Sequence, residues 1–277
     1  MPARITAIWM LTILAGLAST TASCGSRKSG DPAERPVDHM VRVTAGPFQV
    51  GCSPHDAPPC VKETALPRQV AVPEYDIDVF EVTAIEFRSC VSAHACTPFL
   101  PPAELRDRQP ALVSWAQAAG YCRWLGKELP MELQWEKAAR GSDGRAYPWG
   151  DTPPTCKDAH YRSGCNGTNG EDADVGSFTH DRSPFGVFDM LGNAPEWVAD
   201  AWTYDYRADA VSTMSPDPNI DRLVKPNLHD APPCCALFHR IERSPSELTP
   251  DGRELNPGIG FRCARWVGAT GAQRPSK

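Results

Sequence analysis

The segment Val113–Trp149 constrains the fold most, because it carries two helix patterns separated by a break. In its first half, apolar residues recur at helical spacing, with Ser114 as a candidate N-cap and Gly126 as a candidate C′ residue. A second helix is predicted after the break at 127–130, and it ends at Gly141. Tryptophans, a cysteine and a run of alanines on short helices favour close packing against one core. We therefore expect this segment to be scaffold, with any chemistry located elsewhere.

Short strands are predicted before this segment and near the end of the chain. Met40–Val50 alternates apolar and polar residues and contains the turn-forming pair Gly46-Pro47, which predicts a short hairpin. Val70–Val82 also alternates, which is typical of a strand. Further extended pieces are expected at Val175–Phe178 and Gly258–Val267. With 28 prolines and 21 glycines in 277 residues, many loops are expected between these elements.

One more helix is predicted between the early strands and the central segment. Its cap is Thr83 and it runs to Ala93, with Ile85, Phe87 and Val91 expected to face the core. The predicted elements are therefore short strands, two or three short helices and many connecting loops.

The first 23 residues have the organisation of an export signal. A single basic residue, Arg4, precedes the apolar run Ile5–Ala18, which is too short to be a convincing membrane span. Small residues then lead to Cys24, so residues 1–23 resemble a bacterial lipoprotein signal whose cysteine becomes the lipidated N-terminus. Thr21 stands where such signals prefer leucine, and the alternative is an ordinary secretory signal cleaved nearby. Both interpretations predict export, and a diacylglycerol anchor would also attach the protein to a membrane surface.

A polar tether is predicted to precede one domain. Residues 24–39 contain almost nothing apolar, which is typical of a flexible linker. Residues 40–270 are long enough to bury one sizeable core, and residues 271–277 form a short tail. The formal net charge is −6 and no block of lysine or arginine stands out, so nucleic acid is not an expected partner.

The 11 cysteines predict a disulfide framework, because an even number remains in an exported chain if Cys24 carries lipid. Three pairs lie close in sequence and are expected to staple loops: Cys52–Cys60, Cys90–Cys96 and Cys156–Cys165. The cysteines left over are Cys122, Cys234, Cys235 and Cys263. They lack paired C-x-x-C spacing, so a zinc site is the weaker interpretation.

Six stretches of the chain carry recognisable motifs in a fixed order. They are MVRVTAGPFQVG from Met40, FEVTAIEF from Phe80, VSWAQAAGYCRWLGKELPMELQWEKAARG from Val113, YPWGD from Tyr147, FGVFDMLGNAPEW from Phe185 and GFRCAR from Gly260. On these motifs the chain resembles the formylglycine-generating enzyme, or sulfatase-modifying factor, family over nearly all of its predicted domain. The resemblance implies a single α+β domain with a loop-rich, C-type-lectin-like fold and little regular secondary structure.

The resemblance also implies one long disulfide. Family members of the eukaryotic type join the cysteine of the first central helix to the cysteine of the GFRC motif, which here are Cys122 and Cys263. A second long bridge of those relatives falls on Ala139 and Arg240, so both of its cysteines are absent together.

The chemistry of the family implies a thiol pair that this chain does not carry in full. The enzymes oxidise a sulfatase cysteine, within Cys-X-Pro-X-Arg, to formylglycine by means of two active-site cysteines that bind copper. Two soft thiolates on one face of a pocket select Cu(I). The second position falls here on Cys235, whereas the first falls on Asp230. A copper oxidase of the family type is therefore not expected.

Three interpretations of the adjacent residues Cys234 and Cys235 stay open. They form a strained vicinal disulfide, they form a relocated metal or redox pair with His229 or His239, or one of them is free. Two adjacent cysteines cannot both face one copper ion in the family's geometry without backbone distortion. We favour a structural disulfide in a loop.

The calcium sites of the family give a further expectation. One of them falls on four positions that offer oxygen donors: Asp189, Gly192, Ala194 and Glu196. Two carboxylates and two backbone carbonyls suit Ca²⁺, and the alternative is that Asp189 and Glu196 only brace a turn. The other family site falls near His160, Tyr161 and Asp172 in a shortened loop, and is the weaker expectation.

Two functional hypotheses follow. The first is an exported, lipid-anchored member of the family on the periplasmic or cell-surface side of a membrane. It would be related to enzymes that oxidise a cysteine of an exported protein, with the copper thiol pair incomplete. The second is a non-catalytic binding module that holds a protein, peptide or glycan partner on the same fold. The pair Asp230 and Cys235 separates them, because one thiol favours binding and two would favour oxidation.

Overall fold

The computed structural model describes residues 38–52, 67–98, 105–159, 172–201, 220–225 and 258–268, and the backbone of 241–243, 247–248 and 254–255. All of these ranges belong to one unit of the chain, Ala33–Lys277. The predicted export signal and four cysteine-site positions lie outside them: Cys24, Asp230, Cys234 and Cys235. None of the helices in the described ranges has the length and hydropathy that a bilayer-spanning helix needs.

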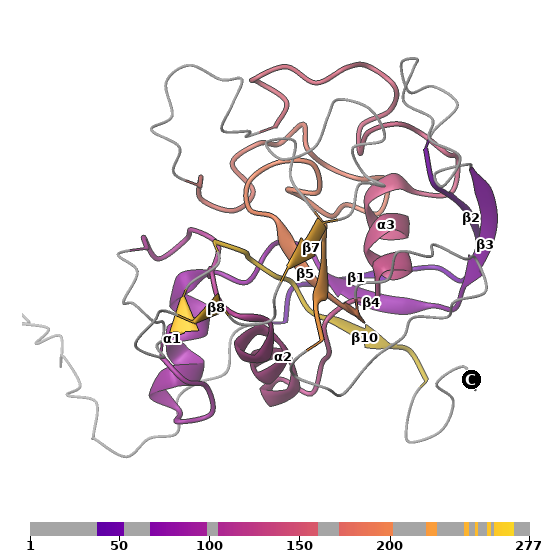
Figure 1. Ribbon diagram of the computed structural model, residues 1–277. Helices are drawn as coiled ribbons and strands as arrows, with labels where there is room; N and C mark the ends of the chain where they lie inside the picture. The colour runs from indigo at the N-terminus through magenta and orange to yellow at the C-terminus, as the bar shows by residue number, and fades with distance from the viewer. Residues whose placement is uncertain are drawn as a thin grey trace, which may run out of the picture. The chain divides into compact units, whose positions relative to one another are not determined.

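The described ranges contain three short helices, each at a place that the sequence predicts (Figure 1). They are α1 at Ala84–Ser92, α2 at Trp115–Trp124 and α3 at Glu132–Arg140. The side-chain oxygens of Thr83 and Ser114 accept hydrogen bonds from the N–H groups of Glu86 and Gln117, which completes a capping box at the start of α1 and of α2. Gly126 follows α2 with a φ of 73°, a left-handed conformation that favours glycine after a helix.

The strands form small antiparallel sheets that bring distant parts of the chain together. β4 (Tyr75–Asp78) pairs with β1 (Met40–Val43) on one side and with β10 (Ala264–Trp266) on the other. The first and last strands of the domain therefore share one sheet (Figure 1). β2 (Gly46–Val50) and β3 (Arg68–Val72) form a separate two-stranded sheet.

A second three-stranded sheet has the order β5 (Glu196–Ala201), β6 (Arg222–Lys225) and β7 (Ile241–Arg243). The pairing of β5 with β6 shifts register after Trp197, which marks a bulge or irregularity in β5. β8 (Glu247–Leu248) pairs with β9 (Glu254–Leu255). Because β5 packs against both α2 and α3, its side chains lie in the interior of the domain.

Two strand predictions are wrong, the first in the pairing partner and the second in the length of the strand. Met40–Val50 is not a hairpin, because β1 pairs with β4 whereas β2 pairs with β3 in a different sheet. Val70–Val82 is not one strand, because β3 ends at Val72 and Pro73 and Glu74 separate it from β4. Alternation identifies strands and their buried face, but the choice of partner depends on tertiary contacts that lie far along the chain.

Three smaller expectations also need correction. Ile85 is 48% exposed, because the buried face of α1 runs through Phe87 and Cys90 and misses it. Val175–Phe178 is not extended, since the glycine at its second position takes a φ of 72° and makes a turn. Within Gly258–Val267, only β10 is a strand.

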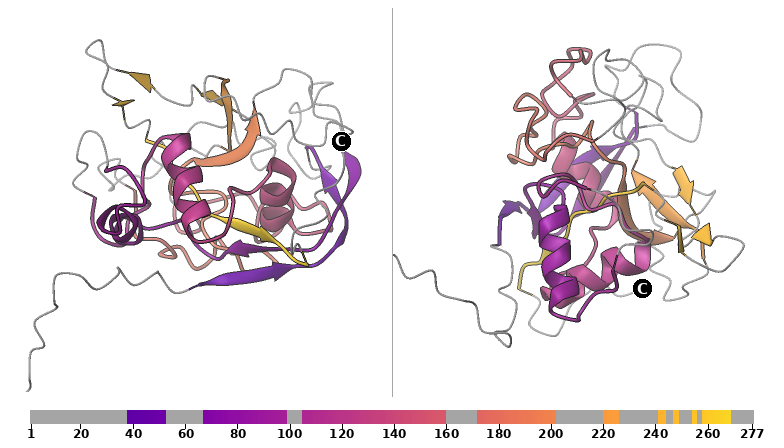
Figure 2. Two further views of the ribbon diagram at one scale, coloured as in Figure 1. Left: turned by 90° about the horizontal axis from the view of Figure 1, so that it is seen from below. Right: turned by 90° about the vertical axis from the view of Figure 1, so that its left-hand side faces the viewer.

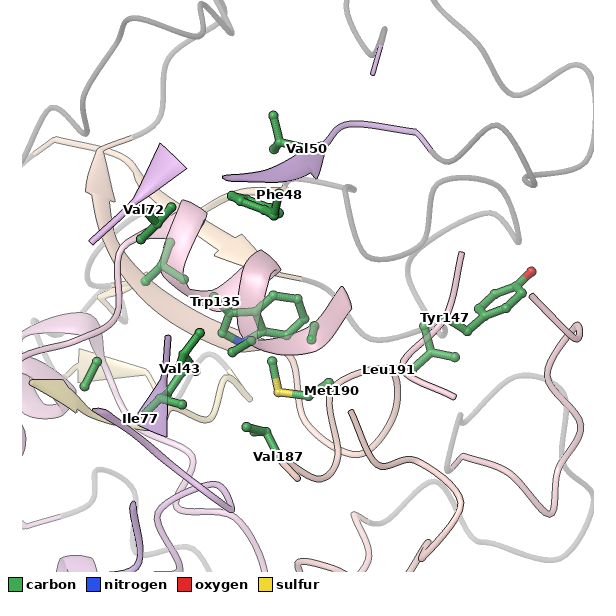
Figure 3. Close-up of a cluster of buried hydrophobic side chains, with 14 of the residues drawn as sticks. Val43, Phe48, Val50, Val72, Ile77, Trp135, Tyr147, Val187, Met190 and Leu191 are labelled. Carbon is green, nitrogen blue, oxygen red and sulfur yellow. The ribbon is translucent and has the colours of Figure 1, made fainter. Parts of the chain in front are cut away.

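Two clusters of buried apolar side chains form the core. The first surrounds Trp135 of α3 and includes residues of β1 to β4 (Figure 3). The second joins α1 and α2, which lie side by side in both views of Figure 2, to Trp197 of β5 and to Phe261. Truncating a buried tryptophan of this kind to alanine costs about 3–5 kcal/mol. Both helices of the central segment thus contribute to the core.

Disulfides reinforce the second cluster. Cys122 of α2 is bonded to Cys263, which lies directly before β10, and Cys90 is bonded to Cys96 at the end of α1. Both pairs are those expected from the sequence. Cys52 and Cys156 are also disulfide-bonded. The partners expected for them, Cys60 and Cys165, lie outside the described residues.

Candidate functional site

The expected calcium positions lie on a buried loop, Asp189–Glu196, that leads into β5. Asp189 and Asn193 take φ values of 57° and 66°, which aspartate and asparagine tolerate better than most residues. Asp189 is 3% exposed, Asn193 2% and Glu196 1%. Because water is excluded from this loop, each of its polar groups needs a partner inside the protein.

Glu196 is held by a buried arginine, Arg262. The guanidinium Nε lies 2.8 Å from Oε2 of Glu196, and a second guanidinium nitrogen lies 2.5 Å from Oε1. Trp135 Nε1 also donates to Oε2 at 2.8 Å. Burial disfavours the charged guanidinium, but the charge of Glu196 and its hydrogen bonds outweigh that effect and raise the pKa of Arg262. Glu196 is therefore an ion-paired carboxylate with both oxygens occupied.

Glu81 approaches the same loop from the segment between β4 and α1. One of its oxygens accepts a hydrogen bond from Asn193 Nδ2 at 2.8 Å, and the other accepts from the N–H of Ala194 at 3.1 Å. Burial raises the pKa of Glu81 well above its ordinary value, and the charges of Asp189 and Glu196 add to the rise. Glu81 thus shapes the loop mainly as a hydrogen-bond acceptor for it.

Two aspartates complete the arrangement. Asp181 Oδ2 accepts hydrogen bonds from the N–H groups of Leu191 and Gly192, each at 3.0 Å, whereas its Oδ1 is buried without a hydrogen-bond partner. Burial raises the pKa of Asp181 to about 7. Asp189 Oδ2 accepts from the N–H of Gly176 at 2.6 Å, and burial raises the pKa of Asp189 to about 6.

We call these four side chains the buried acidic cluster: Glu81, Asp181, Asp189 and Glu196. They face one guanidinium, that of Arg262, whose charge lowers the pKa values of three of them. The remaining negative charge is costly in a region without water, so the cluster must bind protons or a cation.

The donor set fits calcium in its chemistry. Carboxylate oxygens are hard donors, and the unpartnered Oδ1 of Asp181 is the kind of atom that a cation would satisfy. A cation at the four expected positions would have to share Glu196 with Arg262. Within the described ranges, no three His, Cys, Asp or Glu side chains gather as a metal-binding group, so backbone carbonyls would have to complete the ligand set. The bracing role considered as the alternative is visible in the contacts of Asp189 and Glu196 with the protein.

Other predicted site residues contribute little to this cluster. Asp172 is buried, and its backbone carbonyl accepts a hydrogen bond from Gln109 Nε2 at 2.6 Å. His160 and Tyr161, expected with it at the second calcium site, lie outside the described residues, as do Asp230 and Cys235 of the expected thiol pair.

Sequence reasoning missed three members of the site. Arg262 stands inside the GFRC motif, but the motif drew attention to its cysteine. Glu81 stands inside an alternating pattern that favours a strand, and Asp181 lies in a polar loop without a distinctive pattern. For Arg262 and Glu81, a charged residue inside an otherwise apolar motif was the available signal, because such a residue is usually buried only when it is paired.

Comparison with known proteins agrees with this architecture. The model of the sulfatase-modifying factor enzyme 1-like domain matches residues 26–267. The formylglycine-generating enzyme of Bos taurus is 29% identical over 298 residues, which cover 87% of this chain and 77% of that protein. An inactive C-alpha-formylglycine-generating enzyme 2 of Bos taurus is 27% identical over 290 residues, covering 86% of this chain and 89% of that protein.

A solved structure shares the fold. PvdO from Pseudomonas aeruginosa superposes with a TM-score of 0.66 and 24% identity, covering 82% of this chain and 94% of that chain. The fold is therefore the loop-rich, single-domain α+β fold expected from the sequence. Because the family model spans most of the chain, the protein belongs to the sulfatase-modifying factor family, as a divergent member.

Proposed function

We propose that this protein is an exported, lipid-anchored sulfatase-modifying factor domain that has lost copper-dependent oxidation and acts by binding a partner. The observation that carries the proposal is Asp230, which takes the position of the first active-site cysteine in the alignment of motifs. A carboxylate is a hard ligand, whereas Cu(I) selects soft thiolates. Cys234 is no simple replacement, because adjacent side chains point in different directions in most backbone conformations.

The family fold does not require the activity. A bovine relative that aligns over 89% of its own length is named inactive C-alpha-formylglycine-generating enzyme 2. In this chain, the described core consists of the two clusters of buried apolar side chains and the Arg262–Glu196 ion pair. None of these residues lies between Asp230 and Cys235 in the sequence. A domain with an incomplete thiol pair therefore keeps the contacts that hold its fold, and a surface for a protein, peptide or glycan partner can persist.

The oxidase question has a direct test. Reduced protein is incubated with copper, oxygen and a Cys-X-Pro-X-Arg peptide, and aldehyde formation is followed by mass spectrometry. We expect no copper-dependent aldehyde, and we expect restoration of a second thiol by Asp230→Cys to increase copper binding. Turnover by the unaltered protein that is lost in Cys235→Ser would overturn the proposal and make Cys235 catalytic.

Export is supported by the oxidised cysteines. Disulfides such as Cys90–Cys96 and Cys122–Cys263 persist in oxidising compartments and are rare in the cytosol. Together with the short apolar run that ends at Cys24, they favour a mature chain held on the outer side of a membrane by lipid.

Calcium is the cofactor that the buried acidic cluster best accommodates, at Asp189 and Glu196 with the carbonyls of Gly192 and Ala194. A bound cation would offset the negative charge that Arg262 leaves uncompensated. After chelation, adding calcium at about 100 times its Kd should stabilise the fold by about 2.7 kcal/mol in urea titrations. Asp189→Asn should remove that gain, whereas Asp143→Asn, at an exposed carboxylate, should keep it. Equal gains in both variants would place the cation elsewhere.

A further inference from the structure

A pocket of about 270 Å³ lies at the N-terminal end of α1. Tyr121 of α2, Glu86 of α1 and Arg108 supply polar groups to its lining. Its apolar lining comes from five side chains: Phe80, Val82, Ile85, Leu125 and Val175. The volume is just below the range of about 300–1,000 Å³ that is usual for ligand sites, so a ligand here has to be small.

Tyr121 contributes an unused hydroxyl to this pocket. Its ring is fixed by aromatic contacts, with centroids 5.9 Å from Phe87 and 5.5 Å from Phe261, and the residue is 1% exposed. The hydroxyl has no hydrogen-bond partner among the described residues. Burial raises the pKa of Tyr121, and the charges of Glu86 and Asp78 raise it further, so the group stays a neutral phenol. Because the hydroxyl is not among the buried atoms that lack a partner, it opens onto the pocket, where a ligand atom can take the place of water as its hydrogen-bond partner.

Most of the charged groups around the pocket are already compensated. The Lys127 ammonium lies 2.7 Å from carboxylate oxygens of both Asp38 and Asp78. Glu81 is buried, and its raised pKa favours the neutral acid. His39 stands exposed at the rim. Lys127 is thus engaged by two carboxylates, and Glu81 by Asn193 and Ala194, which leaves the recognition of a charged ligand to other side chains.

Glu86 and Arg108 are the charges that remain available. Glu86 Oε2 accepts hydrogen bonds from the N–H and hydroxyl of Thr83 at 2.8 and 2.6 Å, which leaves Oε1 without a partner among the described residues. Arg108 is exposed, and its guanidinium makes no ion pair in the described part of the chain. The pocket thus offers one free carboxylate oxygen, one free guanidinium and one free hydroxyl above an apolar wall.

We infer that this pocket binds a free α-amino acid with an apolar side chain, whose ammonium is held by Glu86 and Tyr121 and whose carboxylate is held by Arg108. The opposite charges match the two ends of a zwitterion, and the apolar wall matches its side chain. Charge-assisted hydrogen bonds of this kind are roughly twice as strong as neutral ones. The inference does not depend on the thiols, so its failure would leave the proposed function untouched.

A series of ligands that each lack one part of the amino acid tests the inference on the unaltered, disulfide-intact protein. Isothermal titration calorimetry compares L-leucine with isoamylamine, which lacks the carboxylate, with 4-methylpentanoate, which lacks the ammonium, and with glycine, which lacks the apolar chain. We expect L-leucine, or L-phenylalanine in the same series, to bind at least about tenfold more tightly than each truncated analogue. Amine and amino acid binding equally would overturn the zwitterion assignment, and no heat from either amino acid at millimolar concentration would overturn the site.

Variants then locate the ligand. Glu86→Gln removes the charge but keeps a side-chain acceptor for the capping box, and Tyr121→Phe removes only the hydroxyl. We expect about a tenfold loss of affinity for Glu86→Gln and Arg108→Gln, and about fivefold for Tyr121→Phe. Arg106→Gln is the matched control, because Arg106 is exposed on the same loop but does not line the pocket.

Equal effects of Arg106→Gln and Arg108→Gln would refute a specific carboxylate contact. Far-ultraviolet circular dichroism and the urea midpoint check that each variant is folded. Should Tyr121→Phe fail to fold, Arg108→Gln and the analogue series decide the outcome, because Arg108 is an exposed residue outside the core.

Discussion

The long disulfide offers a quantitative test of how this loop-rich domain is stabilised. Replacing both Cys122 and Cys263 with alanine would open a bridge that spans 141 residues. In the chain-entropy model, a loop of that length restricts the unfolded chain by about 5 kcal/mol at 25 °C. Both sulfurs are fully buried in the second core cluster, so small packing losses add to that figure.

The short disulfide, Cys90–Cys96, is a matched control because it lies in the same core cluster. Cys90 and Cys96 are separated by 6 residues, and the same formula assigns their bridge about 2 kcal/mol. The two alanine double variants should therefore differ in free energy of unfolding by about 3 kcal/mol. Urea titration under non-reducing conditions, with linear extrapolation and a check that the slope m is comparable, measures the difference.

Two results would contradict this reasoning. Similar losses for the two double variants would show that loop length does not govern the stabilisation, and that local contacts of the sulfurs do. Alkylation of Cys122 or Cys263 in the folded, non-reduced protein would show that the bridge is not formed in solution. A domain near the lower end of the ordinary stability range of about 5–15 kcal/mol would retain little of it after the long bridge is lost, so the titration should begin at low temperature.

Three further outcomes are expected. Cys24→Ala should move the protein from the membrane fraction to the soluble fraction after cell lysis; membrane association unchanged in that variant would contradict the lipoprotein assignment. Arg262→Met should cost about 3–5 kcal/mol in urea titrations, because it leaves the Glu196 carboxylate buried without its ion pair; a loss below about 1 kcal/mol would mean that the ion pair contributes little to the stability of the fold. Ser114→Ala should cost about 1 kcal/mol by removing the cap of α2, with Ser142→Ala, at an exposed serine, as an unaffected control.

The helices were predictable because their determinants are local. The caps Thr83 and Ser114 act on N–H groups within the same turn, and Gly126 sets a backbone angle at its own position. Strand pairing was not predictable in the same way, since β4 receives β1 from the start of the domain and β10 from its end. Alternation carries no information on partners that are so distant, and the expected hairpin at Met40–Val50 failed for that reason.

The candidate site was also predictable only where its sequence signal is local. The motif resemblance located Asp189 and Glu196, because the loop between them has a compact sequence signature. It did not reveal that Arg262, 66 residues from Glu196, occupies both oxygens of that carboxylate. Burial of Glu81 and Asp181 also depends on the assembled fold, because the same residues in an exposed loop would be ordinary surface acids.

Arg262 holds together parts of the fold that lie far apart in the sequence. Its guanidinium donates to the carbonyls of Asp78 and Val79 beside β4, to the carbonyl of Phe188 before the buried loop, and to Glu196 at the start of β5. One side chain thus ties together the sheet that joins the two ends of the domain, the loop with the acidic cluster, and the strand between α2 and α3. None of these contacts involves a thiol. None of these contacts is made by residue 230, so the loss of oxidation that we propose would leave in place every contact of Arg262 with the described residues.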